Sequence, residues 1–347
     1  MSVANGFEDR AKGVLLGLAC GDALGRPVEF ASPEQIKREH GCVTDMLGNG
    51  THRQPSGTIT DDTEMALCIA RSLVEQEQFD PTDVAERFVA WYESGPFDIG
   101  MMTRRALSRI QHGESWETAG EREWKASPEG SNAGNGSVMR CASLAIAYAD
   151  YPAALVRTSM DSSRITHADP RCTLGCAVLN LTIAAAIQDQ DAPLSAALNL
   201  LSEDLATSMQ RTAGVIPDGA STVLEDGVPQ ELRTAVEAIP DGIDPDQLSN
   251  SGYVVDTLQT ALYDALTAES VEEAIITAVN RGGDTDTIGA IAGAIAGARF
   301  GGSSLPNRWL DEIDERGELK RVAIELAGHP CGTESNDGSS EGDVDGA

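Results

Sequence analysis

The sequence predicts an all-α fold, a single compact domain built from many helices. Apolar residues recur at the three- to four-residue spacing of a helix along almost the whole chain, whereas runs of β-branched residues are scarce. Two segments, residues 12–24 and 288–300, carry a glycine at every fourth position. A glycine inside a helix costs about 1 kcal/mol relative to alanine. We therefore expect both helices at the centre of the molecule, where a bare backbone lets a neighbour approach closely.

The other helices are predicted in chain order from apolar periodicity and from residues that favour helix ends. Ser32, Pro33 and Gln35 form a capping box with proline in the first turn. Asp80-Pro81 opens another helix in the same way. We expect helices near residues 33–40, 65–74, 81–91, 101–110, 116–124, 138–149, 155–163, 172–188, 195–211, 229–238, 253–267, 270–280 and 319–327. Loops are expected at residues 44–59, 217–230 and 240–251, which are rich in glycine or in other turn-forming residues.

The composition indicates a globular protein from a salt-rich environment. The 347 residues are 41% hydrophobic, enough for a sizeable core, and the formal net charge is −30 with a pI near 4.3. Such acidity argues against binding of nucleic acid or anionic membranes, which requires a basic surface. Lysine is confined to Lys12, Lys37, Lys125 and Lys320. We interpret this as halophilic, since concentrated salt screens carboxylate repulsion; full folding and activity without added salt would contradict the interpretation.

Cysteine usage predicts buried free thiols, and the N-terminal and apolar segments leave a cytoplasmic location as the default expectation. The seven cysteines show no CxxC spacing, and most fall within apolar helical patterns, so we expect buried free thiols. Residues 1–10 are polar, the apolar run 14–20 is too short for a signal peptide, and no run of about twenty apolar residues predicts a membrane span. Residues 332–347 are rich in Ser, Gly, Asp and Glu and predict a disordered acidic tail after a domain covering residues 1–331.

Two acidic motifs, far apart in sequence, are the strongest functional signals. Thr60-Asp61-Asp62-Thr63 and Gly283-Asp284-Thr285-Asp286-Thr287 each place two carboxylates and hydroxyl groups at the start of an apolar helix. Crowded carboxylates are costly unless a cation or strong donors neutralise them, and Asp and Thr oxygens suit magnesium, manganese or calcium. The simpler interpretation is helix capping, by Asp61 with Glu64 and by Asp284 or Asp286. Because one cap needs one oxygen, we favour a cluster of two divalent cations, which is compatible with capping.

Four further loops place polar residues just before an apolar helix. Residues 21–29 offer Asp22 and Glu29, and residues 96–100 offer Asp98. Residues 135–140 offer backbone N–H groups at a predicted helix start, a cradle for an anion. His167 stands in a short motif before Pro170. A turn with a cap would explain any one of them alone. The sequence lacks GxxxxGK[ST] and HExxH motifs, which argues against several ATPase and hydrolase classes.

Together these motifs resemble the ADP-ribosylglycohydrolase family, which includes the dinitrogenase reductase-activating glycohydrolases and the ADP-ribosylarginine hydrolases. The resemblance covers roughly residues 8–302 and follows the family's order. It is carried by Gly21-Asp22-Ala23-Leu24-Gly25 with Glu29, Thr60-Asp61-Asp62-Thr63, Asp98-Ile99-Gly100, Asn135-Gly136-Ser137-Val138-Met139-Arg140, Thr166-His167 with Pro170, Gly252-Tyr253-Val254-Val255-Asp256-Thr257-Leu258, and Gly282-Gly283-Asp284-Thr285-Asp286-Thr287.

The resemblance implies an all-α enzyme that cleaves the N- or O-glycosidic bond between ADP-ribose and a modified side chain. It also implies a centre of two magnesium or manganese ions that orient the ribose diol or a water molecule. The ligands implied are Thr60, Asp61, Asp62, Asp284, Asp286 and Thr287. The partner would be an ADP-ribosylated protein or a small ADP-ribose conjugate. We expect a monomer, because an internal core accounts for the glycine stripes better than a dimer interface does.

The resemblance further assigns roles around the scissile bond. Asp98 is implied as general base or proton shuttle, and Asp98-Ile99-Gly100 favours ADP-ribosyl-arginine as substrate, with Gly100 at the substrate. Glu29 is the second catalytic candidate and would lead in a serine-directed enzyme. The remaining substrate contacts implied are the backbone of Ser137, Val138 and Met139 to the diphosphate, His167 to a phosphate or ribose oxygen, and Tyr253 to adenine. Alternatives are hydrolysis of ADP-ribosyl-serine or O-acetyl-ADP-ribose, or a non-catalytic relative that binds ADP-ribose.

Overall fold

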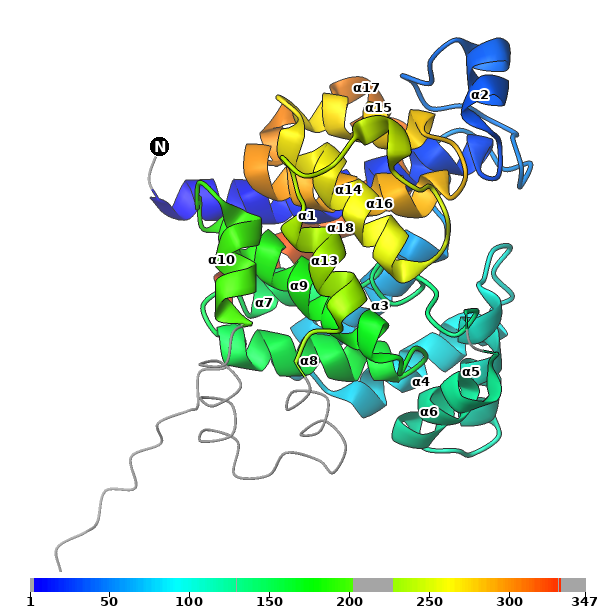
Figure 1. Ribbon diagram of the computed structural model, residues 1–347. Coiled ribbons are helices and arrows are strands. Elements are labelled where there is room, and N and C mark those ends of the chain that lie inside the picture. The colour runs from blue at the N-terminus through cyan, green and yellow to red at the C-terminus, as the bar shows by residue number, and fades with distance from the viewer. Residues whose placement is uncertain (1–2, 129, 202–226, 330, 332–347) are drawn as a thin grey trace, which may run out of the picture.

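The fold is all-α, as predicted (Figure 1). The computed structural model describes residues 3–128, 130–201, 227–329 and 331, and within these ranges it contains no β-strand beyond two isolated bridges. The α-helices are α1 (Val3–Gly25), α2 (Pro33–His40), α3 (Asp61–Gln76), α4 (Pro81–Glu93), α5 (Met101–Gln111), α6 (Trp116–Ala126), α7 (Ser143–Ala147), α8 (Pro152–Arg164), α9 (Pro170–Ile187), α10 (Pro193–Leu200), α13 (Gln230–Glu237), α14 (Val254–Thr267), α15 (Val271–Asn280), α16 (Thr285–Phe300), α17 (Asn307–Leu310) and α18 (Arg316–Gly328). Short 3₁₀ turns cover Arg26–Val28, Pro245–Gln247 and Gly302–Ser304.

Most predicted helices are confirmed, but the one expected at residues 138–149 is wrong. The helix there, α7, is confined to five residues, and residues 135–140 form turns. The N–H groups of Val138 and Met139 both donate to the Asn135 carbonyl, and the Arg140 guanidinium is fully buried, 4.5 Å from the ring centre of Phe88. Because the whole segment is buried, its apolar pattern does not distinguish a helix from a compact turn. The expected tail at 332–347 and the end of the helix expected at 195–211 lie outside the described residues.

The two glycine-striped helices, α1 and α16, form the centre of the fold. They run antiparallel and in contact, with Gly17 opposite Gly293 and Gly21 opposite Gly289. A Cβ atom placed on Gly17 would lie 2.2 Å from the Gly293 carbonyl oxygen, and one placed on Gly293 would lie 2.1 Å from the Gly17 carbonyl oxygen. Only glycine permits this backbone approach. The contact confirms the prediction from the stripes and sets α16, which follows the second acidic motif, firmly against α1.

This helix contact makes Gly17→Ala a severe change. The new methyl group has no space, so the helices must separate, and we expect a loss of about 3 kcal/mol or more in the free energy of unfolding. Gly6→Ala is the matched control in the same helix, because a Cβ atom there meets nothing within 4 Å. It should be neutral or stabilising by up to about 1 kcal/mol. Thermal unfolding of both variants in the same salt measures the difference, and equal melting temperatures would contradict the close packing.

The helix α9 also belongs to this core. It is long and apolar enough to cross a membrane by length and composition, but 89% of its residues are buried inside the protein. Packing against neighbouring helices therefore accounts for its apolar character. Figure 1 shows α8, α9 and α10 on one side of the central pair and α4, α5 and α6 on another, with α3 between these groups.

One buried arginine fixes the loop between α2 and α3. The Arg26 guanidinium is fully buried and donates to four backbone carbonyl oxygens of this loop, with donor–acceptor distances of 2.8–3.3 Å. The acceptors are the carbonyls of Leu47, Asn49, Pro55 and Thr58. The loop is thereby held over residues 26–29, where the Thr51 hydroxyl also donates to the Glu29 carbonyl. This arrangement positions both Glu29 and the loop residue His52.

Candidate active site

The two acidic motifs meet at one cavity of 380 Å³. The first turns of α3, α5 and α16 border it, together with the loop before α7. Most of the side chains predicted for the site line this cavity, namely Glu29, Asp61, Asp62, Asp98, Gly100, Met139, His167, Asp284, Asp286 and Thr287. The fold therefore brings together carboxylates that are more than two hundred residues apart, as the metal-cluster prediction requires. Their individual roles remain predictions.

At the start of α3, the cap is Thr60 and not Asp61. The Thr60 hydroxyl accepts from the Asp62 N–H at 3.4 Å, and α3 begins at Asp61. The interpretation of Asp61 as the capping residue is therefore wrong. Since the adjacent threonine caps the helix, the carboxylates of Asp61 and Asp62 are left to face the cavity.

The buried carboxylate of Asp22, on α1, is hydrogen-bonded to the start of α3 and fixes its position. It accepts from the N–H groups of Thr60, at 3.0 Å, and Thr63, at 3.3 Å, and from the Thr63 hydroxyl at 2.5 Å. Burial raises the pKa of Asp22 to about 6, although these hydrogen bonds oppose the rise. The sequence marked Asp22 only as a loop carboxylate; its positioning role depends on the packing of α1 against α3.

At the start of α16, Asp284 occupies the capping position but makes no capping hydrogen bond. Its carboxylate instead accepts from the Asn135 side-chain amide at 2.8 Å, outside its own helix. Asp286 accepts from the Thr287 N–H at 2.9 Å, and the Thr287 hydroxyl donates to Asp62 at 3.3 Å. Thr287 thus joins the two helix starts. The Asp284 side chain therefore does not cap α16.

The electrostatics of the cluster favour a bound cation. Burial, reinforced by the neighbouring carboxylates, raises the pKa of Asp61, Asp62 and Asp286 well above the usual range. One oxygen of Asp62 is buried and has no hydrogen-bond partner among the described residues. Carboxylate oxygens of Glu29, Asp284 and Asp286 lie within 4.8 Å of one another. An unpartnered buried oxygen amid converging carboxylates suits a hard divalent cation.

These pKa shifts predict how stability depends on pH. The folded, metal-free protein binds more protons than the unfolded chain, because the carboxylate pKa values are raised on folding, for Glu29 to about 9 by burial and by Asp98. Its stability should therefore fall as pH rises from about 4, the unfolded value, towards 9. Divalent cations favour the ionised carboxylates and should remove most of this fall. Melting temperatures at pH 5, 7 and 9, with chelator or with magnesium at constant salt, measure the effect; identical pH profiles would contradict the cation site.

Glu29 and Asp98, the two catalytic candidates, lie on either side of one histidine. The His52 Nε2 atom is 2.5 Å from a Glu29 carboxylate oxygen and 3.5 Å from an Asp98 carboxylate oxygen. The Asp98 side chain is 23% exposed and so reaches the open part of the cavity, whereas Glu29 is 7% exposed. Burial raises the pKa of Asp98. His52 was not predicted from the sequence, because it stands in a loop without a recognisable motif and is positioned by contacts distant in sequence.

Only half of the residues predicted to contact the substrate line the cavity. Gly100, Met139 and His167 line the cavity, whereas Ser137, Val138 and Tyr253 are not among its lining residues. The prediction that residues 135–140 form an anion cradle at a helix start is wrong, because no helix begins in this segment. The N–H groups of Val138 and Met139 are already bonded within the chain.

The hydrogen bonds of three of these residues limit how each could contact a ligand. His167 is buried, its Nδ1 lies 2.7 Å from the Thr166 hydroxyl, and burial lowers the pKa of His167 to about 3. It can therefore offer a neutral ring to a ligand but not a cation. The Ser137 hydroxyl accepts from the Ser163 hydroxyl at 2.9 Å. The Tyr253 hydroxyl accepts from Arg171 at 3.1 Å, so this tyrosine belongs to a separate polar cluster at the start of α14.

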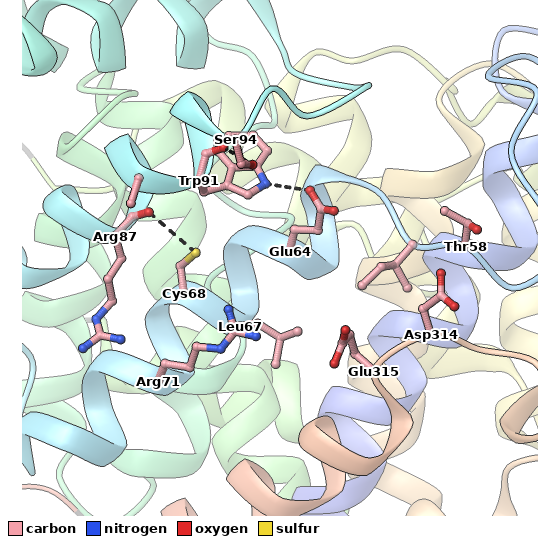
Figure 2. Close-up of a pocket in the computed structure, with 12 residues that line it drawn as sticks. Thr58, Glu64, Leu67, Cys68, Arg71, Arg87, Trp91, Ser94, Asp314 and Glu315 are labelled. Carbon is pink, nitrogen blue, oxygen red and sulfur yellow. Dashed lines mark hydrogen bonds between the residues drawn. The ribbon is translucent and has the colours of Figure 1, made fainter.

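A second cavity, of 510 Å³, lies along another face of α3 (Figure 2). The Glu64 carboxylate, which lines this cavity, accepts from the Trp91 indole N–H at 2.6 Å, a hydrogen bond that is drawn as a dashed line in Figure 2. Its arginines already have carboxylate partners: Arg71 pairs with Glu318, and Arg87 pairs with residues on α3 and α4. The arginines here are neutralised by carboxylates, whereas the carboxylates of the first cavity converge with no arginine or lysine among the residues that line it. We therefore take the 380 Å³ cavity as the candidate active site.

Comparisons with known proteins agree with this geometry. The ADP-ribosylglycohydrolase family profile matches residues 4–336. The chain is 34% identical to the ADP-ribosyl-[dinitrogen reductase] glycohydrolase of Rhodospirillum rubrum, over 90% of this chain and 92% of that protein. It is 36% identical to the ADP-ribosylarginine hydrolase Tri1 of Pseudomonas putida (strain GB-1), over 92% of this chain and 78% of that protein.

A solved structure described as an ADP-ribosylglycohydrolase-related protein complex has a similar fold. The TM-score is 0.74 at 32% identity, and the match covers 94% of this chain and 99% of the other. The predicted fold, family and enzyme class are thereby confirmed. The chain belongs to the ADP-ribosylglycohydrolase family, and it is a hydrolase of the glycosidic bond to ADP-ribose.

Proposed function

We propose that the protein is a metal-dependent hydrolase that releases ADP-ribose from modified arginine side chains. The observation that carries the proposal is the pair of carboxylates, Glu29 and Asp98, which both lie within 3.5 Å of the His52 Nε2 atom beside the acidic cluster. Two carboxylates around a planar nitrogen group are the partners that a guanidinium prefers. A relative at 36% identity is named an ADP-ribosylarginine hydrolase, which supports the same substrate.

The acidic cluster supplies the metal ligands in this proposal. Thr60, Asp61, Asp62, Asp284, Asp286 and Thr287 would hold two divalent cations, Mg²⁺ or Mn²⁺. Such ions, when bound, polarise an oxygen and orient the ribose hydroxyls or a water molecule. The chain's own part is to fix the geometry: Asp22 holds the start of α3, and the Asn135 amide holds Asp284. The complete set of carboxylates argues against a non-catalytic relative.

Asp98 performs the proton transfer in this proposal. Its carboxylate lines the same cavity as the acidic cluster and is partly exposed, so it can bind the substrate guanidinium by charge-assisted hydrogen bonds. It then accepts a proton from the attacking water and returns a proton to the departing guanidine nitrogen. A pKa raised by burial brings Asp98 nearer to the working pH, which favours both transfers. Glu29, deeper in the site, orients the water.

The second candidate function is hydrolysis of ADP-ribosyl-serine or O-acetyl-ADP-ribose. The observation that favours it is the proximity of Glu29 to the cluster, within 4.8 Å of oxygens of Asp284 and Asp286. A carboxylate so placed can lead the chemistry at an oxygen-linked substrate, where no guanidinium needs a partner. We further propose that the protein acts as a monomer in a salt-rich cytoplasm.

The test is hydrolysis of ADP-ribosyl-arginine and ADP-ribosyl-serine in high salt, with added magnesium, added manganese or chelator. Metal-dependent release of ADP-ribose from the arginine conjugate, faster than from the serine conjugate, is the expected result. Faster release from the serine conjugate would favour the second function. Release unaffected by chelation would contradict the metal centre.

A further inference from the structure

Exposed apolar side chains gather at the mouth of the candidate active site. Among the described residues, the large hydrophobic side chains that are exposed are Phe30 (71%), Met101 (65%), Phe97 (39%) and Leu200 (38%). Phe30 and Met101 border the 380 Å³ cavity directly, and the Phe97 ring lies 5.4 Å from that of His52. In a chain of net charge −30, such a cluster at one opening is a distinct feature. We call Phe30, Phe97 and Met101 the apolar rim.

The backbone of Phe30 makes this rim unusual. Its φ angle is +64°, in the left-handed region that bulky residues rarely adopt. The surrounding loop imposes that angle, because the Phe30 N–H donates to the Gly283 carbonyl at 2.7 Å and the Gly283 N–H donates to the Ala31 carbonyl at 2.9 Å. Glycine or asparagine would satisfy the same backbone at lower cost. Since its ring is mostly exposed, Phe30 gains little from burial in return, and folding stability does not account for it.

The position of the apolar rim indicates which part of a bound substrate would contact it. Each rim residue directly adjoins a predicted site residue in sequence: Phe30 follows Glu29, Phe97 precedes Asp98, and Met101 follows Gly100. A modified arginine side chain is only a few bonds long, so its own backbone must come to the mouth of the cavity when its guanidinium meets Asp98. The residues beside the modified arginine then lie against the apolar rim. The riboses and the charged diphosphate of ADP-ribose are polar and have no comparable need for these side chains; contact of the rim with the adenine is an outcome that the test below distinguishes.

We propose that the apolar rim is a docking surface for the polypeptide that carries the modified arginine, and that it selects apolar residues next to that arginine. This inference rests on the proposed function, since it places the modified side chain in the cavity. Burial of two large apolar side chains from each partner should favour such a substrate by about tenfold or more in kcat/KM. Concentrated salt does not screen apolar contacts as it screens ion pairs, so the rim suits the environment inferred from composition.

The test compares three substrates: free ADP-ribosyl-arginine, an ADP-ribosylated peptide with leucine on both sides of the modified arginine, and the same peptide with serine on both sides. The protein variants are Phe30→Asn, which suits the positive φ angle, Met101→Gln, and both together. We expect the wild-type protein to prefer the leucine peptide about tenfold in kcat/KM, mainly through KM. The double variant should lose this preference and keep full activity on free ADP-ribosyl-arginine.

The control is Leu200→Gln, which removes the exposed apolar side chain of α10, far from α5 in Figure 1. It should leave the leucine preference intact. A preference that is absent in the wild type, or unchanged in the double variant, would overturn the proposal. An equal loss on free ADP-ribosyl-arginine would also overturn it, because the rim would then contact ADP-ribose itself. Size-exclusion chromatography showing a dimer that only the rim variants dissociate would assign the rim to self-association instead. Failure of the wild type to hydrolyse any of the three substrates would instead overturn the proposed function.

Discussion

Asp98→Asn is expected to lower kcat on ADP-ribosyl-arginine by about a thousandfold, the usual scale for loss of a general acid–base group. The amide keeps the size of the side chain but can neither accept the water proton nor pair with a guanidinium. Asp98 is outside the set of predicted metal ligands, so the variant should bind divalent cations as the wild type does. Steady-state kinetics together with calorimetric metal titration would separate the two effects.

Glu64→Gln is the matched control for this experiment. Glu64 is also a partly buried carboxylate whose pKa is raised by burial, but it accepts from Trp91 in the second cavity (Figure 2). Its replacement should leave kcat within about twofold of the wild type. Full activity of Asp98→Asn would refute the role assigned to Asp98. A large loss in Glu29→Gln alone would then transfer the leading role to Glu29.

Asp62→Asn should have opposite effects on function and on stability. With one ligand charge removed, we expect divalent affinity to fall by about a hundredfold or more and hydrolysis to be lost with it. In chelator, however, the variant should be more stable than the wild type by about 1–3 kcal/mol, because the Asp62 carboxyl group, whose pKa is raised by burial, must take up a proton on folding, whereas the neutral amide need not. Its amide oxygen can still accept from the Thr60 and Thr287 hydroxyls, which now bond to Asp62 at 3.4 and 3.3 Å.

Asp264→Asn provides the contrast. Asp264 is equally buried, but it receives two hydrogen bonds from Arg281, at 2.7 and 2.6 Å. Its replacement leaves that arginine without its charged partner, so the variant should be less stable by about 3 kcal/mol whether or not metal is present. Thermal unfolding of both variants, with magnesium and with chelator, measures the four values. A chelated Asp62→Asn protein that is less stable than the chelated wild type would contradict the repulsive cluster.

The sequence was sufficient for those parts of the fold that depend on local signals. The capping box of Ser32 and Gln35 and the Asp80-Pro81 helix start both appear as predicted, because each is made by residues a few positions apart. The glycine stripes indicated the central helix pair because glycine destabilises a helix. Repeated glycines therefore indicate that close packing against another helix offsets this cost. The acidic motifs indicated a shared site because they contain more carboxylates than two helix caps need.

The parts that could not be predicted depend on contacts between distant segments. His52 enters the site because Arg26 ties its loop down through four carbonyl groups, and no local pattern records such bonds. Asp22 acts on the start of α3 only because α1 lies beneath it. The error at residues 138–149 has the same origin, since burial on all sides produces an apolar pattern without a helix.

The pairing of α1 with α16 also bears on how the protein is made in the cell. α1 ends at Gly25 and α16 begins at Thr285, so at about 5–20 residues per second roughly 15 to 50 s of translation separate the two. During that time a glycine-rich apolar helix has left the ribosome without its native neighbour. Chaperones, or provisional contacts with the helices that are made before α16, must shield it. Because the same late segment carries Asp284 and Asp286, a nascent chain has no complete catalytic cluster until its core can close.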